Sequence, residues 1–304
     1  MLRANEAGKR ARKMQSKVAV ITTVRDDDFF LKKWVAYYGG FFGKEALYVI
    51  NHGNQKAVRE IAAGCNLFPI PDKDTSNFNI RRWRTQNGLL AALRQWYTHV
   101  IVCDVDEFIV VDPEIGHDLG SWLLDVAKPG RVRTALGLEV LHLKDREPEG
   151  IAQSILGPRR HVQLNPWYSK PCVISHPARL SRGGHYATWN KLDAPDFLYL
   201  FHMKYCDFDL YVDMLDRRRD MVKAAGVTEM KEKKTKAVWF EDSRDDEAVF
   251  APFLTREVDE GWDFSAYRAY MRKTFTHRNN ELYHFKRKGS DSLFKLPERF
   301  SGIV

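Results

Sequence analysis

The feature that most constrains this chain is the apolar run 100–102, Val-Ile-Val, which leads directly into Cys-Asp-Val-Asp-Glu-Phe at 103–108. Side chains alternate along a β-strand, so a strand continuing through this segment would place Asp104 and Asp106 on one face and Glu107 on the other. Hard divalent cations bind carboxylate oxygens together with substrate phosphates. The segment therefore predicts a metal and diphosphate site at the carboxyl end of a buried strand or, in the simpler interpretation, a polar strand end.

The composition fits a folded domain with anionic partners. The 304 residues are 44% hydrophobic, enough for a sizeable core in one large domain or in one domain with an extension. Lysine and arginine outnumber aspartate and glutamate by 48 to 40, which gives a net charge of +8. This balance favours a nucleotide diphosphate, an acidic glycan or membrane headgroups as partners. Nucleic acid is not expected, because the basic residues are dispersed and no nucleic-acid motif accompanies them.

The cysteines and the N-terminus favour a cytoplasmic protein. Four cysteines, at positions 65, 103, 172 and 206, lie far apart and form no Cys-x-x-Cys pair, which fits a reducing compartment. The segment 1–16 is basic and lacks the apolar core of a signal peptide, and no stretch approaches the ~20 apolar residues that span a bilayer. We expect a mobile basic arm at 1–16, which together with Arg217–Arg219 could hold the protein at the anionic inner face of a membrane.

Strand and helix patterns alternate along the N-terminal third. Apolar runs predict strands at 17–24, 45–50 and 67–70, and helical periodicity predicts helices at 29–38, 55–63 and 82–96, the first ended by Gly39, Gly40 and Gly43. This alternation predicts an α/β fold with a parallel sheet and crossover helices. In such sheets ligands gather beyond the carboxyl ends of the strands, where Arg25, the loop at 51–54 and the two aspartates would meet.

After position 113 the pattern is mixed. We expect a helix at 119–127, strands within 131–142, at 172–175 and at 198–202, and a helical, highly charged segment from 209 onward. The predicted organisation is the basic arm at 1–16, a main domain at 17–208 and a helical C-terminal extension at 209–304.

Four stretches carry a resemblance to a known family. They are the strand and helix at 24–38, the helix with Arg84, Gln86 and Asn87, the segment 104–108, and Lys170-Pro171 with His185 and the stretch 201–205. In this order they resemble the GT-A-fold nucleotide-sugar glycosyltransferases, in particular a bacterial family-two-like group with an Asp-x-Asp-Glu-Phe signature. The likeness spans roughly residues 18–215. The sequence departs from the family at 51–54, where Asn-His-Gly-Asn replaces the usual nucleoside-binding pattern, and it lacks the Glu-Asp pair of many family-two enzymes.

The resemblance implies a GT-A fold, a Rossmann-like mixed sheet flanked by helices, with a Mn²⁺ or Mg²⁺ ion that bridges the two phosphates of the donor. Asp106 is the expected main metal ligand, Asp104 would reach the metal through water or contact the ribose, and His202 or His185 would be a further ligand. The donor contacts that the resemblance implies are Arg25, Asn51, Arg84, Asp104, Lys170 and Lys204. The alternative for each charged residue is an ion pair, and for each histidine a place in the core.

The predicted function is a metal-dependent, inverting transferase of the kind used in polysaccharide biosynthesis. It would move a sugar from a nucleotide-diphosphate donor, most simply a UDP-sugar, to a hydroxyl of a glycan or lipid-linked acceptor. The general base would be a carboxylate beside that hydroxyl, and Glu139, Asp193 and Asp196 remain alternatives. Aromatic side chains could stack on sugar rings or pack in the core: Trp167, Tyr168, Tyr186 and Trp189. The rival functions are a non-catalytic glycan- or nucleotide-binding protein with the same fold and a metal-dependent nucleotidyltransferase.

Overall fold

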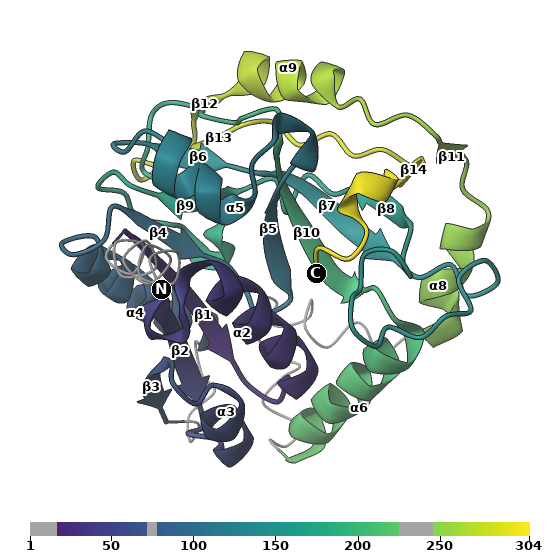
Figure 1. Ribbon diagram of the computed structural model, residues 1–304, viewed down its shortest axis with the longest axis horizontal. Helices are drawn as coiled ribbons and strands as arrows, with labels where there is room; N and C mark the ends of the chain where they lie inside the picture. Colours follow the sequence, from purple (N-terminus) through teal and green to yellow (C-terminus); the bar gives the residue numbers. More distant parts are fainter. Residues whose placement is uncertain (1–16, 72–77, 225–245) are drawn as a thin grey trace, which may run out of the picture.

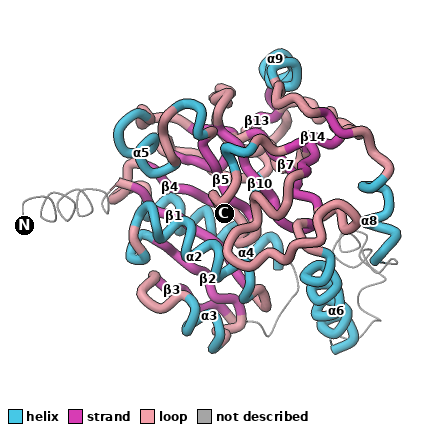
Figure 2. The backbone as a smooth tube through the Cα atoms, turned by 45° about the vertical axis from the view of Figure 1, so that its right-hand side comes forward, coloured by secondary structure: helices cyan, strands magenta, loops and turns pink. Residues whose placement is uncertain are grey.

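The computed structural model describes residues 17–71, 78–224 and 246–304. The predicted basic arm at 1–16 and the side chains of Arg218 and Arg219 lie outside the described part. In the described part, no helix is both long and apolar enough to cross a membrane. The fold is mixed α/β, with two mixed sheets in the middle of the molecule and helices around them (Figures 1 and 2).

The first sheet contains the predicted strand–helix alternation. Its strand order is β3-β2-β1-β4-β9-β6. The first four strands run parallel, and β9 is antiparallel to both β4 and β6. The strand bounds are β1 Val18–Val24, β2 Leu47–His52, β3 Asn66–Ile70, β4 His99–Val102, β6 Val132–Thr134 and β9 Pro171–Ile174. The parallel sheet expected from the alternation is therefore confirmed.

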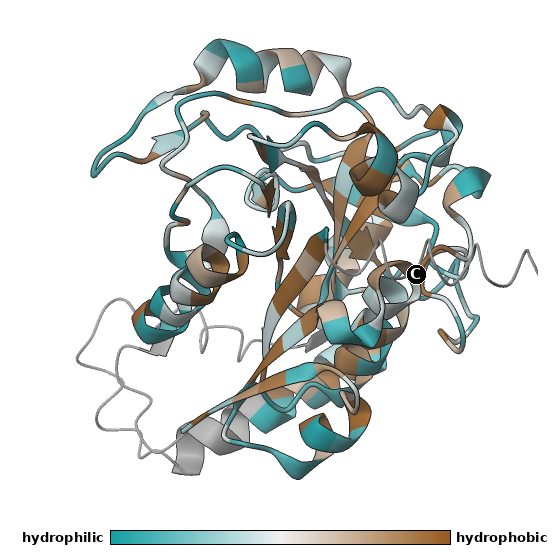
Figure 3. Ribbon diagram, turned by 60° about the vertical axis from the view of Figure 1, so that its left-hand side comes forward, coloured by the Kyte–Doolittle hydropathy of each residue, from teal (hydrophilic) through white to brown (hydrophobic). Residues whose placement is uncertain are grey.

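Two helices cover opposite faces of this sheet. Strand β1 is buried along its whole length, as expected for a central parallel strand. Val18 and Val20 join the apolar cluster of α2 (Asp28–Phe42), whereas Ala19 and Ile21 join that of α4 (Phe78–Leu93). The shorter α3 (Lys56–Ile61) and η1 (Lys44–Ala46) connect the outer strands. Figure 3 shows the apolar strands enclosed by these amphipathic layers.

Of the three glycines predicted to end the first helix, Gly43 does so, whereas Gly39 and Gly40 do not. Helix α2 continues through Gly39 and Gly40 and ends only at Gly43, whose φ of 81° lies in the left-handed region that favours glycine. Gly39 lies against the side chain of Leu47, 3.6 Å from where a Cβ would be. Gly39 and Gly40 therefore do not break the helix.

The second sheet draws strands from both halves of the chain. Its order is β11-β14-β8-β7-β10-β5, with β7 parallel to β10 and β10 antiparallel to β5. The bounds are β5 Glu107–Val111, β7 Leu136–Leu141, β8 His161–Leu164, β10 Leu198–Tyr205, β11 Val258–Asp259 and β14 Leu293–Lys295. Its apolar residues share one core with α2, because Tyr37 and Tyr38 pack on Phe108.

The C-terminal part is not only helical, unlike the predicted extension. Helices α6 (Phe208–Ala224), α8 (Asp246–Leu254) and α9 (Ser265–Thr274) are present, but β14 pairs with β8 and completes the second sheet. A hairpin of β12 (Thr276–His277) and β13 (Tyr283–His284) follows α9. The remaining short elements are η2 Pro113–Ile115, α5 Leu119–Ser121, η3 Trp122–Val126, η4 Arg182–Gly184 and η6 Glu298–Phe300.

Candidate active site

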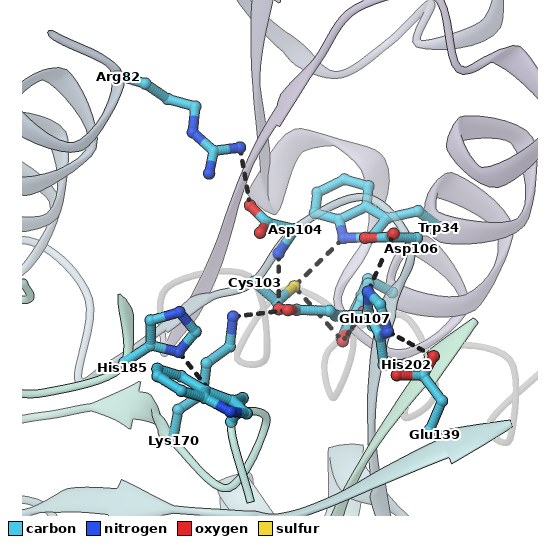
Figure 4. Close-up of polar contacts among 12 residues, drawn as sticks. Trp34, Arg82, Cys103, Asp104, Asp106, Glu107, Glu139, Lys170, His185 and His202 are labelled. Carbon is cyan, nitrogen blue, oxygen red and sulfur yellow. Dashed lines mark hydrogen bonds and ion pairs between the residues drawn. The ribbon is translucent and has the colours of Figure 1, made fainter. Parts of the chain in front are cut away.

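The Asp-x-Asp segment is a tight turn between the two sheets. Strand β4 ends at Val102 and β5 begins at Glu107, whose backbone N–H donates to the Asp104 carbonyl at 3.1 Å. The expectation that strand alternation aligns Asp104 and Asp106 is wrong, because neither residue lies in a strand. The turn is anchored below by Cys103, whose Sγ accepts a hydrogen bond from the Trp34 indole at 3.4 Å (Figure 4). The two aspartate side chains remain partly open, 26% and 23% exposed.

The turn follows β4, which lies at the point where the strand order of the first sheet reverses. From β1 the chain proceeds outward to β2 and β3 and then returns to β4 on the other side of β1. In open α/β sheets such a reversal opens a crevice at the carboxyl ends of the two strands, where ligands bind. Residues 103–106 directly follow β4 and lie at this crevice.

A chain of three charged side chains starts at Asp106. Its carboxylate Oδ2 lies 3.2 Å from Nε2 of His202, and Nδ1 of His202 lies 2.7 Å from Oε1 of Glu139 (Figure 4). The register explains the alignment, because His202 on β10 pairs with Glu107 of β5 on one side and Glu139 of β7 on the other. The Tyr168 ring stacks on the imidazole at a centroid distance of 3.7 Å and holds its plane.

The charges of Asp106, His202 and Glu139 depend on one another. Burial alone would lower the pKa of His202, but the carboxylates of Glu139 and Asp106 outweigh it and raise that pKa to about 10. Burial would raise the pKa of Asp106, but the charge and hydrogen bond of His202 lower it to about 2. Two carboxylates thus enclose one imidazolium, and the cluster keeps a net negative charge.

The donor set fits a divalent cation. Two ligand bonds of about 2.1 Å at a right angle span roughly 3 Å, close to the observed distance between Asp106 and His202. Glu139 accepts from the other ring nitrogen of His202, which is the usual arrangement behind a metal-binding histidine, and a metal would replace the Nε2 proton. Among the described residues, no three His, Cys, Asp or Glu side chains form a metal cage. The protein therefore offers Asp106 and His202, and phosphates or water would complete the coordination.

Glu107, next to Asp106, has a structural role. Its Oε1 accepts from the Lys170 ammonium at 2.6 Å and its Oε2 accepts from the Asp104 backbone N–H at 2.9 Å. Glu107 and Lys170 are 0% and 2% exposed. Burial would lower the pKa of Lys170, but the Glu107 and Asp104 carboxylates raise it. Lys170, expected at the donor phosphates, is therefore occupied in fixing the turn.

Helix α4 contributes a different arginine from the one expected. Arg82 donates to the Asp104 carboxylate at 3.2 Å, whereas Arg84 is exposed and is not brought to the turn. Positions two apart on a helix point ~200° from each other, so only one of the two can face the turn. Arg82 shares its face with Gln86, whose amide donates to Thr23 at the end of β1.

Three further residues predicted for the donor site are engaged locally. The Arg25 guanidinium pairs with Asp26 at 3.1 Å, at the mouth of the crevice. Asn51 is buried, and its side chain bonds the backbone of Gln55 in both directions and so shapes the loop. Lys204 lies over the rings of Tyr205 and Tyr211, against α6.

The second histidine considered as a metal ligand lies apart from the first. Nδ1 of His185 bonds the carbonyl of Trp167 at 2.9 Å, and burial, together with the charge of Lys170, lowers its pKa to about 4. Figure 4 shows its ring beside Lys170, on the other side of Glu107 from His202. His185 is an uncharged residue beside the site, and the structure does not bring it to Asp106.

Of the general-base candidates, only Glu139 lies in the cluster. Asp193 pairs with Arg131 and Arg133, and Asp196 pairs with Arg272. Asp196 lies just before β10, six positions ahead of His202 in the sequence, which corresponds to roughly 20 Å of extended chain. The structure therefore supports neither aspartate as a base beside Asp106. Glu139 itself is engaged by His202 and by the Asn165 amide, the latter at 3.1 Å.

A turn between β8 and β9 holds the site together, although Tyr168 and Lys170 within it were predicted for sugar stacking and donor binding instead. Within 165–170, Asn165 reaches Glu139, Tyr168 covers His202 and Lys170 reaches Glu107. The turn packs on the backbone of Gly137, where an added Cβ would lie 2.2 Å from the Tyr168 carbonyl carbon. Only glycine fits there, but a single glycine in an apolar strand does not reveal which backbone approaches it.

No protein-family model matches the chain, and none of the curated proteins compared with it is similar enough in sequence to indicate a relationship.

Proposed function

We propose that the protein is a metal-dependent glycosyltransferase with a GT-A-type fold. The observation that carries the proposal is the chain Asp106–His202–Glu139, with a partly open carboxylate and an oriented imidazole nitrogen 3.2 Å apart. It lies at the crevice where a nucleotide would bind an open α/β sheet. The donor in this proposal is a nucleotide-diphosphate sugar, most simply a UDP-sugar, and the acceptor is a hydroxyl of a glycan or lipid-linked sugar.

Asp106, His202 and Glu139 each have a definite task in this reaction. A Mn²⁺ or Mg²⁺ ion held by Asp106 and His202 would neutralise the diphosphate leaving group. Glu139 orients the imidazole through Nδ1, Tyr168 fixes the plane of its ring, and Arg82 holds Asp104 at the rim. In the transfer, the bond between the anomeric carbon and the diphosphate oxygen breaks, a bond to the acceptor oxygen forms, and the hydroxyl proton leaves to a base.

The first test is ligand-dependent stability. The melting temperature would be measured with UDP-, GDP-, CMP- and dTDP-sugars, each with and without Mn²⁺, in the native protein and in Asp106→Asn. A ligand that binds only the folded protein raises its stability by mass action. We expect a Mn²⁺-dependent rise with one nucleotide that Asp106→Asn abolishes. If no nucleotide raises the melting temperature of the native protein, the proposal fails.

One observation favours a second candidate, a nucleotide-sugar-binding protein without transfer activity. All three carboxylates predicted as general bases are engaged in hydrogen bonds or ion pairs. Turnover separates the candidates: Mn²⁺-dependent release of nucleoside diphosphate from the stabilising donor indicates an enzyme, whereas binding without release indicates the second candidate.

A further inference from the structure

A cluster of cations and aromatic rings lies beside the candidate active site. Its members, called the arginine–aromatic patch below, are Trp167, Tyr186, Arg278 and Arg287. The Arg287 guanidinium lies 3.7 Å from the centre of the Trp167 ring and 4.8 Å from that of Tyr186. Arg278 lies 4.4 Å from the Tyr186 ring. Trp167 is 54% exposed although it is a large apolar residue, so the patch presents a half-exposed indole with positive charge over its ring.

The patch is built by segments that are distant in sequence. The backbone N–H of Tyr283, in the hairpin that follows α9, donates to the carbonyl of Ala187 at 2.9 Å, which holds the hairpin against the loop of Tyr186. Arg278 follows one strand of this hairpin and Arg287 follows the other. On the opposite side, Trp167 belongs to the turn whose next residue, Tyr168, stacks on His202. Trp167 is therefore one residue from Tyr168, which contacts the candidate metal ligand His202.

The charges of the patch are not balanced within the described part of the chain. Neither Arg278 nor Arg287 forms an ion pair with a described carboxylate, although both lie against the same ring of Tyr186. Glu281, the acidic residue of the hairpin loop, pairs with Arg179 at 2.9 Å. Lys286 and Lys288 are exposed on either side of Arg287. Two like charges held around one ring repel each other, and an anion bound between them would relieve that repulsion.

We propose that this patch binds the acceptor, and that the acceptor is an anionic sugar carrying a carboxylate or a phosphate. This inference rests on the proposed function and names its substrate class. A sugar ring presents an apolar C–H face that can lie on the Trp167 indole, while planar guanidinium groups bind carboxylate or phosphate through paired N–H donors. Because Trp167 adjoins Tyr168, a sugar on the indole lies next to the site at which the donor diphosphate would bind.

The test is binding to the full chain without nucleotide or metal. Calorimetric titration would compare a uronic-acid-containing tetrasaccharide, glucose 1-phosphate and the neutral tetrasaccharide maltotetraose. We expect one or both anionic probes to bind at least tenfold more tightly than maltotetraose, and the preferred probe identifies the anionic group. Arg287→Gln and Arg278→Gln should each weaken that binding at least tenfold. Arg179→Gln, an exposed arginine already paired with Glu281, is the matched control and should change it less than twofold.

Two results would overturn the proposal: equal binding of neutral and anionic probes, or native affinity in both Arg278→Gln and Arg287→Gln with unchanged melting temperatures. Asp106→Asn should bind the anionic probe like the native protein, since the patch does not use the metal ligands. Failure of the nucleotide test with anion binding intact would reject the transferase and keep an anionic-sugar site. Nucleotide binding without anion binding would keep the transferase and reject the anionic-sugar site.

Discussion

Asp106 and Glu107 are adjacent carboxylates with opposite surroundings. Asp106 ends the turn between the sheets and keeps 23% of its side chain exposed, facing an imidazole. Glu107 begins β5, points into the core between the sheets, and uses one oxygen for Lys170 and the other for a backbone N–H. The comparison shows that negative charge alone does not identify a metal ligand. The carboxylate that is fully paired inside builds the turn, and the one left partly open can bind a ligand.

The largest effect should follow from breaking the buried pair. Lys170→Met leaves the Glu107 carboxylate buried without its counter-ion, which should lower the free energy of unfolding by about 3–5 kcal/mol. Urea unfolding would measure the change. The double variant Lys170→Met/Glu107→Gln, in which neither charge remains, should recover a large part of the loss. A loss below about 1 kcal/mol in the single variant would show that the pair does not stabilise the turn.

Replacing the partly open carboxylate of Asp106 should affect catalytic activity more than stability. Asp106→Asn keeps the shape of the side chain but removes a charged metal ligand, so Mn²⁺-dependent donor turnover should fall at least ~100-fold, or ~2.7 kcal/mol of activation free energy. The free energy of unfolding should change less than in Lys170→Met. Steady-state kinetics and urea unfolding on the same two variants would check both halves. Equal activity in Asp106→Asn and the native protein would remove Asp106 from the metal site.

The sequence predicted the first sheet better than the site, and the reason is the range of the interactions. The strands and helices of the first sheet follow from local periodicity and from short crossovers. The turn at Asp104 was mistaken for a strand because its apolar neighbours, Cys103 and Val105, continue the alternating pattern. The approach of Glu139 to His202 depends on the register of β7 and β10, which no local pattern specifies. Arg82 could be recognised only once the rotation of α4 was known.

A pH scan should test the far end of β4 without changing the charge of Asp106. His99 begins β4, and burial, with the charges of Arg133 and Lys17, lowers its pKa from 6.5 to about 4. The unfolded chain therefore binds more protons than the folded protein between these values, so stability is lost as the pH falls from 6.5 toward 4. Between pH 7 and pH 5 the loss due to His99 should be on the order of 2 kcal/mol.

Unfolding of the native protein and of His99→Gln at both pH values would isolate this contribution, because the variant has no proton to take up at that position. Asp106, with its pKa near 2, should remain ionised throughout. If the variant loses as much stability as the native protein on acidification, His99 is not the group responsible.

The smallest effect should come from Glu139, which acts on the metal site through His202 alone. Glu139→Gln can still accept the Nδ1–H of His202 through its amide oxygen, so the ring should keep its orientation, but the charge that makes Nε2 a stronger ligand is lost. Loss of such a partner typically weakens metal binding 10–100-fold, and because the hydrogen bond is retained we expect the lower limit, about 1.4 kcal/mol. The free Mn²⁺ signal in electron paramagnetic resonance would measure the affinity. An unchanged affinity would mean that His202 does not bind the metal, and Asp106 would then be the remaining candidate ligand among these residues.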